Sequence, residues 1–198
     1  MKTLLLLLLF LTGCGPSVPK LPQLAQDAVI LAFGDSITYG SGAGEGESYP
    51  SVLQSLLGRT VINSGVPGEI TAESLARLPD VLDENNPKLM ILCIGGNDFL
   101  RGMDERQAAD NIRAMIRLAN EKGAQVVLVG VPKFGIMLSP PEFYRKIAEE
   151  FHVPYEGDVM HKILLHRDLK ADPVHPSANG YRLFAESIAE LLKKSGAI

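Results

Sequence analysis

Four short apolar runs, each followed by a helical pattern or a polar turn, constrain the fold of this chain more than any other feature. The runs cover residues 28–33, 60–63, 89–94 and 126–131 and are rich in Val, Ile and Leu. Continuous apolar runs of this length are typical of parallel strands that are buried on both faces. A weaker strand is expected near residues 153–155.

The helical patterns between these runs place apolar residues on one face. One covers residues 104–122 and ends at Gly123, because glycine commonly follows the last turn of a helix. A second covers residues 177–194, and a third begins at Thr71 and runs toward Asn85. Regular alternation of strand and helix predicts an α/β domain with a central parallel sheet between two helical layers.

Polar motifs stand at the ends of three of the expected strands. Gly34-Asp35-Ser36 follows the first strand, Asn63-Ser64-Gly65 the second, and Gly95-Gly96-Asn97-Asp98 the third. Ligands of open α/β sheets bind beyond the carboxyl ends of the strands. The three motifs therefore predict a site at one edge of the sheet.

A serine in the first of these motifs has two chemical partners near the other end of the chain. Ser36 is a candidate nucleophile, His175 a candidate general base, and Asp172 a candidate group to orient that base. Each residue also has a structural alternative. Serine after a strand is a common helix N-cap, and Asp172 and His175 would suit a surface turn. Asp35 and Asp98 are expected to hold loops through backbone hydrogen bonds.

The chain resembles the GDSL/SGNH hydrolase family, in its bacterial branch of thioesterase I, lysophospholipase and arylesterase-like enzymes. Four blocks match in order: Gly34-Asp35-Ser36-Ile37, Gly65 in Asn-Ser-Gly-Val-Pro-Gly, Gly95-Gly96-Asn97-Asp98, and Asp172-Pro173-Val174-His175-Pro176. The resemblance implies a flavodoxin-like three-layer α/β/α sandwich and a triad of Ser36, His175 and Asp172. It also implies an oxyanion hole formed by Ser36, Gly65 and Asn97, and no metal or organic cofactor.

The pattern departs from the family in two places. Ile37 stands where leucine is commonest, and the loop over residues 132–138 has no close match, which leaves acyl-chain preference open. Apolar residues near this edge either cover the core or form an acyl-binding groove. They are Phe99, Leu100, Phe134, Ile136, Met137 and Leu138.

Other candidate binding sites are weak. The glycine-rich stretch 40–46 fits no phosphate-loop pattern, and Glu45 and Glu47 would repel phosphate. His161 and His166 are five residues apart, which is not the spacing of one helix face, so no metal site is expected. The net charge is −4 without a basic cluster, which argues against a nucleic-acid partner.

The first 13 residues are expected to be a removed lipoprotein signal peptide. Lys2 precedes an apolar run over residues 4–11, which is too short for a membrane span of about 20 residues. Leu11-Thr12-Gly13-Cys14 resembles a lipobox, which implies lipid attachment at Cys14. The alternative is an ordinary secretory signal with a chance cysteine.

Residues 14–27 carry three prolines and are expected to form an extended linker before a domain over residues 28–198. Cys93, the other cysteine, lies within an apolar run and is expected to be a small buried hydrophobe.

These features predict a serine ester hydrolase exported to the bacterial cell envelope and anchored in a membrane by its N-terminal lipid. Gly15 after Cys14 resembles a sorting signal that would place the anchored protein at the periplasmic side of the outer membrane. A monomer is expected, acting on a small-molecule or lipid ester. Aryl esters, thioesters and lysophospholipids remain open as substrates, as do O-acetyl groups on envelope carbohydrate. A ligand-binding lipoprotein without activity is the alternative from another class.

Overall fold

A single parallel sheet of five strands forms the centre of the molecule. The computed structural model describes residues 18–133 and 138–198. The strand order is β2-β1-β3-β4-β5, and every neighbouring pair is parallel. The strands are β1 (Ile30–Gly34), β2 (Val61–Gly65), β3 (Leu89–Cys93), β4 (Gln125–Val129) and β5 (Tyr155–Glu156).

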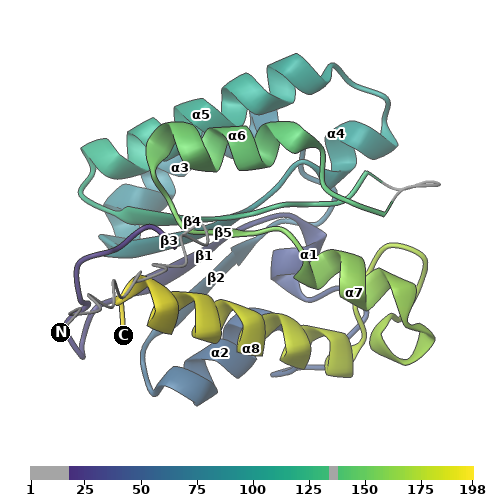
Figure 1. Ribbon diagram of the computed structural model, residues 1–198, viewed down its shortest axis with the longest axis horizontal. Coiled ribbons are helices and arrows are strands. Elements are labelled where there is room, and N and C mark those ends of the chain that lie inside the picture. The colour runs from purple at the N-terminus through teal and green to yellow at the C-terminus, as the bar shows by residue number, and fades with distance from the viewer. Residues whose placement is uncertain (1–17, 134–137) are drawn as a thin grey trace, which may run out of the picture.

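Helices cover both faces of this sheet, which confirms the predicted three-layer α/β/α sandwich. Figure 1 shows α3, α4, α5 and α6 on one side and α1, α2, α7 and α8 on the other. The helices are α1 (Ser36–Tyr39), α2 (Tyr49–Leu57), α3 (Thr71–Asn85), α4 (Gly96–Leu100), α5 (Glu105–Glu121), α6 (Glu142–Phe151), α7 (Val159–Leu165) and α8 (Ala178–Ser195).

The three predicted helices lie where the helical patterns place them. Asp104 caps α5 by accepting a hydrogen bond from Arg106 N–H, and Ser177 caps α8 by accepting one from Gly180 N–H. Helices α2 and α6 were not predicted. The first begins with Pro50 in its opening turn, a position that tolerates proline because the first N–H groups of a helix have no partner within it.

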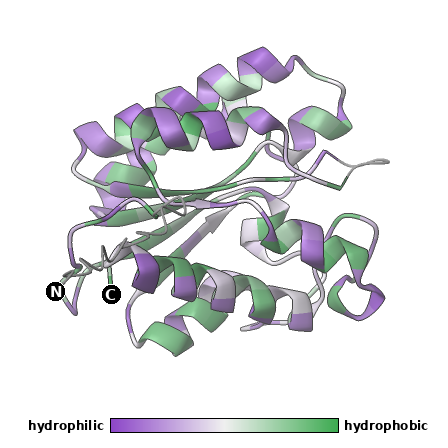
Figure 2. Ribbon diagram, in the orientation of Figure 1, coloured by the Kyte–Doolittle hydropathy of each residue, from purple (hydrophilic) through white to green (hydrophobic). Residues whose placement is uncertain are grey.

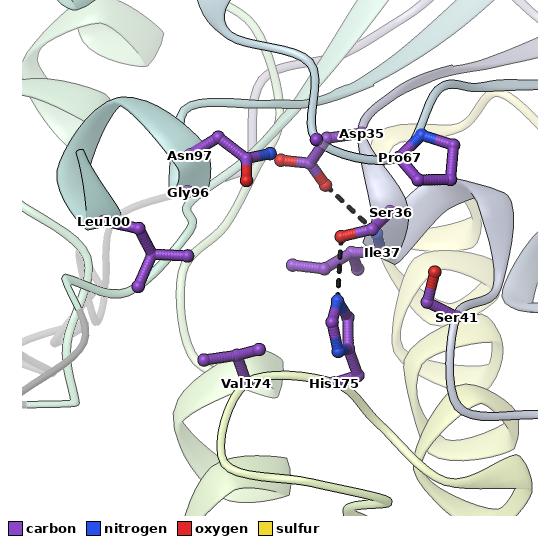
Figure 3. Close-up of a pocket in the computed structure, with 11 residues that line it drawn as sticks. Asp35, Ser36, Ile37, Ser41, Pro67, Gly96, Asn97, Leu100, Val174 and His175 are labelled. Carbon is purple, nitrogen blue, oxygen red and sulfur yellow. Dashed lines mark hydrogen bonds between the residues drawn. The ribbon is translucent and has the colours of Figure 1, made fainter.

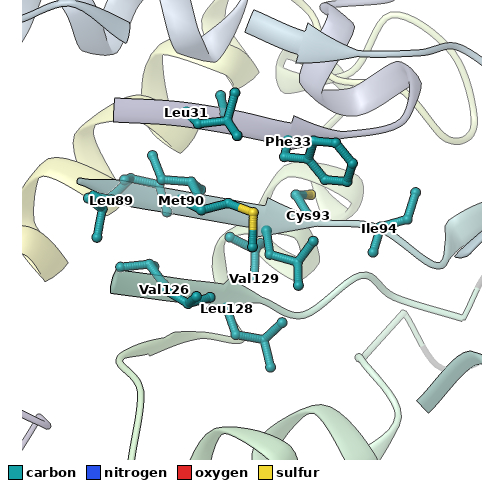
Figure 4. Packing of buried hydrophobic residues seen from close by; sticks show 14 of the residues in the cluster. Leu31, Phe33, Leu89, Met90, Cys93, Ile94, Val126, Leu128 and Val129 are labelled. Carbon is teal, nitrogen blue, oxygen red and sulfur yellow. The ribbon is translucent and has the colours of Figure 1, made fainter. Parts of the chain in front are cut away.

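The core lies on both faces of the central strands. All five residues of β1 and of β3 are buried, as expected for strands covered by helices on both sides. Figure 4 shows side chains of β1, β3 and β4 packed together, and Figure 2 shows that polar residues gather on the outer faces of the helices. Cys93 is fully buried among them, as predicted.

Two glycines let the chain pack tightly at the carboxyl edge of the sheet. Gly34 and Gly65 are paired residues of β1 and β2. A Cβ atom on Gly34 would lie 1.9 Å from the Cys93 carbonyl oxygen, and one on Gly65 would lie 2.1 Å from Tyr39 N. Helix α1 therefore rests against the end of β2 through backbone atoms.

Residues 18–27, which we call the N-terminal strap, lie against the domain. Leu21 N–H and Leu24 N–H donate hydrogen bonds of 2.9 Å to the carbonyls of Ser195 and Ala197. The Leu24 side chain is buried. The strap is thus attached to the carboxyl end of α8, and Figure 1 shows the C-terminus at that end.

This arrangement differs from the free linker predicted for residues 14–27. Proline content suggested an extended spacer, but Leu24 has an apolar partner in the core, and the strap N–H groups find acceptors beyond the end of α8. Cys14 and the signal peptide lie outside the described residues. Within residues 18–133 and 138–198, no helix has the length and apolarity needed to span a membrane.

Candidate active site

Ser36 stands where β1 ends and α1 begins. The Asp35 carboxylate accepts a hydrogen bond of 3.0 Å from Ile37 N–H and so caps this short helix. Ser36 is the first residue inside α1 and not its cap, which removes the purely structural alternative for its hydroxyl. The side chain is free to make a contact across the site.

A chain of hydrogen bonds joins Ser36, His175 and Asp172. Ser36 Oγ lies 2.9 Å from His175 Nε2, and His175 Nδ1 lies 2.7 Å from Asp172 Oδ2. Figure 3 shows the serine hydroxyl and the imidazole ring pointing toward each other. The structure thus brings together three residues that are up to 139 positions apart in the chain.

A tight turn before α8 holds the aspartate against the histidine. Asp172 Oδ1 accepts hydrogen bonds of 2.8 Å from the N–H groups of Val174 and His175. Partial burial raises the pKa of Asp172, but hydrogen bonds from the His175 ring and from these N–H groups outweigh it and bring the pKa below its usual value. The carboxylate is therefore ionised at neutral pH and fixes the orientation of the ring.

Asn97 enters the site from α4. Its Nδ2 donates a hydrogen bond of 3.0 Å to the backbone carbonyl of Glu69. An amide nitrogen has two hydrogens, so one remains to point elsewhere. The neighbouring Asp98 accepts hydrogen bonds from the N–H and hydroxyl of Thr71, at 3.0 and 2.6 Å, and so holds loops together as predicted.

Gly65 does not join the other predicted site residues. Its N–H donates a hydrogen bond of 3.0 Å to Asn63 Oδ1, and it does not line the pocket that contains Ser36. The predicted place of Gly65 in an oxyanion hole is therefore wrong. Gly68, three residues later, lines that pocket instead.

A turn after β2 explains this shift. Glu69 N–H donates to the Val66 carbonyl, Pro67 is the second residue of the turn, and Gly68 has a φ of +82°. Proline followed by a left-handed glycine is the signature of a type II turn. Arg101, at the carboxyl end of α4, donates a hydrogen bond of 2.7 Å from Nη2 to the Gly68 carbonyl. This bond fixes the orientation of the peptide group that follows Gly68.

A partly buried ion pair also supports this loop. Arg77 on α3 contacts both carboxylate oxygens of Glu69, at 2.6 and 2.8 Å, and Glu69 is buried. The same guanidinium donates to the hydroxyl and carbonyl of Ser64 and lies 4.1 Å from the centre of the Phe33 ring. One side chain thereby ties the end of β1, the end of β2 and the loop that carries Gly68.

Asp35 is the most perturbed acid of the site. Complete burial raises its pKa to about 7, although the hydrogen bond from Ile37 N–H and the charge of nearby His175 act in the opposite direction. Its carboxyl is thus near half-protonated at neutral pH, unlike that of Asp172.

A cavity of about 260 Å³ opens beside Ser36. Its walls are mostly apolar, with Ile37, Pro67, Leu100 and Val174 around the hydroxyl (Figure 3). Its other lining residues are Asp35, Ser36, Ser41, Gly68, Gly96, Asn97 and His175.

The residues proposed for an acyl groove separate in the structure. Leu100 lines the cavity, whereas Phe99 and Leu138 pack against the core, and Phe99 contacts Phe143 with ring centres 6.2 Å apart. Phe134, Ile136 and Met137 lie outside the described residues. In the described ranges, no three His, Cys, Asp or Glu side chains gather in a way that suits a metal ion.

Comparisons with known proteins identify the family of this chain. The family model described as GDSL-like lipase/acylhydrolase matches residues 32–183. An arylesterase of Vibrio mimicus is 32% identical over 176 residues, which is 83% of this chain and 88% of the relative. The chain belongs to the GDSL-like lipase/acylhydrolase family. Membership of this family supports the prediction that the protein is a serine ester hydrolase.

Two further proteins are similar to this family member. The esterase TesA of Pseudomonas aeruginosa is 34% identical over 152 residues, covering 74% of this chain and 72% of the relative. The crystal structure of a psychrotrophic esterase from Pseudoalteromonas sp. superposes with a TM-score of 0.76 at 24% identity, over 85% of this chain and 98% of that one. The second likeness concerns the fold alone.

Proposed function

We propose that this protein hydrolyses carboxylic esters with Ser36 as nucleophile, His175 as general base and Asp172 as the group that orients the base. The observation that carries the proposal is the 2.9 Å contact between Ser36 Oγ and His175 Nε2 at the wall of an open cavity. A serine hydroxyl is a weak nucleophile unless a base within hydrogen-bond distance takes its proton.

The reaction follows from these positions. Ser36 Oγ attacks the acyl carbon while its proton moves to His175 Nε2, and Asp172 stabilises the resulting imidazolium. The imidazolium then gives its proton to the leaving alcohol, and an acyl-enzyme remains. Water, deprotonated by His175, attacks the acyl carbon and releases the acid and the free serine.

The oxyanion of each tetrahedral intermediate would be held by the N–H groups of Ser36 and Gly68 and by the second hydrogen of Asn97 Nδ2. Gly68 replaces Gly65 in this role, because Gly65 N–H already has Asn63 as its acceptor. Fixed donors of this kind need no rearrangement as charge develops, which is why they lower the barrier.

The cavity favours esters with a small apolar group. Its volume of about 260 Å³ is below the range of about 300–1,000 Å³ usual for drug-sized ligands. Exposed apolar side chains, among them Tyr39, Val66, Leu100 and Met103, follow the carboxyl ends of the strands. We therefore propose short-chain esters with an aryl or other apolar alcohol, as the name of the Vibrio relative also suggests.

The cellular setting is part of the proposal. The sequence of residues 1–14 supports export and lipid attachment at Cys14, and Gly15 supports a location at the periplasmic side of the outer membrane. We propose that the protein acts there as a monomer. The chemistry above needs no metal or organic cofactor.

Hydrolysis of a p-nitrophenyl ester series from acetate to palmitate tests this function. We expect activity with acetate and butyrate that falls with longer chains, and no activity in Ser36→Ala at an unchanged circular dichroism spectrum. Covalent labelling by a fluorophosphonate should depend on Ser36 in the same way. Activity retained by Ser36→Ala would disprove the mechanism, and a maximum at palmitate would favour lipid esters.

A further inference from the structure

One tyrosine joins the two distant segments that carry the proposed nucleophile and its base. Ser36 opens α1, and His175 lies in the turn before α8. Tyr181, in the first turn of α8, donates a hydrogen bond of 2.8 Å from its hydroxyl to the Ser41 carbonyl. Tyr181 follows His175 by six residues, and Ser41 follows Ser36 by five. The bond therefore connects the two segments within a few residues of both groups.

On the serine side, the connection continues through the backbone. The Ser36 carbonyl accepts hydrogen bonds of 3.0 Å from the N–H groups of Gly40 and Ser41. Ser41 is thus held by Tyr181 through its carbonyl and holds Ser36 through its N–H. A shift of Ser41 is passed directly to the residue that carries the nucleophilic hydroxyl.

On the histidine side, close backbone contacts fix the first turn of α8. Tyr181 N–H donates a hydrogen bond of 2.8 Å to the Ser177 carbonyl, and Ser177 N–H donates one of 2.9 Å to the Leu169 carbonyl. A Cβ atom on Gly180 would lie 2.0 Å from that Leu169 oxygen, so the helix packs there through its backbone. Tyr181 therefore keeps a fixed position relative to the turn that contains His175.

The two segments also touch each other at Gly42. Its φ is +94°, and a Cβ atom there would lie 2.8 Å from both the Ala171 Cβ and the Pro176 carbonyl oxygen. The Cβ of His175 would be 3.4 Å away. The glycine-rich stretch 40–46, which fits no phosphate-loop pattern, thus packs against the histidine turn. A displacement of either segment reaches the other.

The Tyr181 hydroxyl is suited to hold this contact. The side chain is fully buried, and burial raises the pKa of its hydroxyl above the usual value, so the hydroxyl stays protonated and donates. A buried hydroxyl requires a hydrogen-bond partner, and the Ser41 carbonyl is that partner.

We infer that Tyr181 is a positioning residue for the proposed reaction, because its hydroxyl, through Ser41, keeps Ser36 Oγ within hydrogen-bond distance of His175 Nε2. The inference rests on the proposed function, in which Tyr181 has no part. The contact it maintains is 2.9 Å long, close to the limit of about 3.2 Å for hydrogen bonds that involve nitrogen. Misplacement of reacting groups by about 1 Å is enough to slow an enzyme about 10²-fold.

The variant Tyr181→Phe of the full chain tests the inference, because it removes the hydroxyl and keeps the buried ring. We expect kcat for p-nitrophenyl acetate to fall at least fivefold while KM changes less than twofold. Labelling of Ser36 by a fluorophosphonate should slow by a similar factor, since it also needs a serine activated by His175. A smaller fall in kcat, or a rise in KM in its place, would overturn the inference.

Ser195→Ala is the matched control. Ser195 Oγ also donates a hydrogen bond of 2.8 Å to a backbone carbonyl, that of Leu192, and it is buried at the other end of α8. Each variant loses one such bond and should lower the midpoint of urea unfolding. Only Tyr181→Phe should lower kcat and the labelling rate. An equal fall of kcat in Ser195→Ala would leave Tyr181 a structural role alone and overturn the inference.

The variant Ser36→Ala separates this result from the proposed function. Hydrolysis that survives in Ser36→Ala would disprove the function itself. Where hydrolysis depends on Ser36 and Tyr181→Phe is as active as the wild type, the positioning role alone is overturned.

Discussion

Asn97 Nδ2 donates a 3.0 Å hydrogen bond to the backbone carbonyl of Glu69, while the Glu69 carboxylate is paired with Arg77. The orientation of the amide thus depends on a loop whose position is fixed by a partly buried ion pair. Arg77 touches no substrate in the proposed reaction, yet it holds both the loop of Gly68 and the acceptor of Asn97. It is a positioning residue.

Replacing Arg77 by methionine should reduce both stability and turnover. The substitution leaves the buried Glu69 carboxylate without its ion-pair partner, and breaking a fully buried ion pair costs about 3–5 kcal/mol. Because Arg77 is partly exposed, we expect a smaller loss of about 1–3 kcal/mol. We expect kcat to fall at least tenfold with little change in KM, because the donors of the oxyanion hole act mainly in the transition state.

Urea unfolding and steady-state kinetics measure the two effects. The double variant Glu69→Gln/Arg77→Met removes the unpaired charge and should recover much of the stability, while kcat stays low. Recovery of kcat together with stability would contradict the positioning role and leave only a structural one.

Truncation of Asn97 to alanine should lower kcat by about 10²–10³ with the fold intact, because one oxyanion donor is lost. Asn97→Asp should be impaired to a similar extent, since a carboxylate of the same shape accepts hydrogen bonds and does not donate them. A kcat of Asn97→Asp within a factor of two of the wild type would rule out donation by this side chain.

The two glycines after β2 should respond differently to alanine. Gly65→Ala should prevent folding or destabilise the protein severely, since its Cβ would lie 2.1 Å from Tyr39 N. Gly68→Ala meets no atom closer than Arg101 Nη2 at 3.9 Å, so its cost is the left-handed φ alone, about 1–2 kcal/mol. We expect a folded Gly68→Ala with a reduced kcat.

Thermal unfolding and ester kinetics distinguish these outcomes. A soluble, active Gly65→Ala beside a fully active Gly68→Ala would remove the assignment of Gly68 to the oxyanion hole.

Asp35 should make stability depend on pH. Its pKa is about 7 in the folded protein and 3.8 in its ordinary state, so between about pH 4 and 7 only the folded protein keeps the proton. Rising pH therefore destabilises the fold across this window, by up to about 4 kcal/mol in total.

Asp35→Asn keeps an oxygen for Ile37 N–H and has no proton to release. Relative to the wild type, its free energy of unfolding should rise as the pH increases from 5 to 8, as measured by urea denaturation. Identical pH profiles for the two proteins would show that Asp35 does not titrate in this window.

The strands and the three residues that the site brings into hydrogen-bond contact could be predicted from the sequence. Apolar runs located β1 to β4, because a strand that is buried on both faces consists almost entirely of apolar residues. Strand β5 agrees with the weak signal near residues 153–155. Ser36, Asp172 and His175 were found as residue types that need one another chemically. Their contact distances required the fold.

Other features depended on long-range packing. Gly65 and Gly68 lie in one short loop, and the family resemblance was assigned to the first, although Pro67-Gly68 carries the signal of a type II turn. The partners of Glu69 were not predicted, because Arg77 reaches it from α3. The strap was predicted to be an extended linker, because no local sequence pattern indicates that Leu24 forms a hydrogen bond beyond the end of α8.

The close approach at Gly34 and Gly65 has a consequence for how such enzymes diversify. The position of Ser36 is set by the close packing of backbone atoms of β1, β2 and α1 at these two glycines. Side chains around the cavity, such as Leu100 and Val174, can then change without displacing Ser36, the proposed nucleophile. Selection for new substrates can act on the walls of the cavity while the reacting atom stays in place.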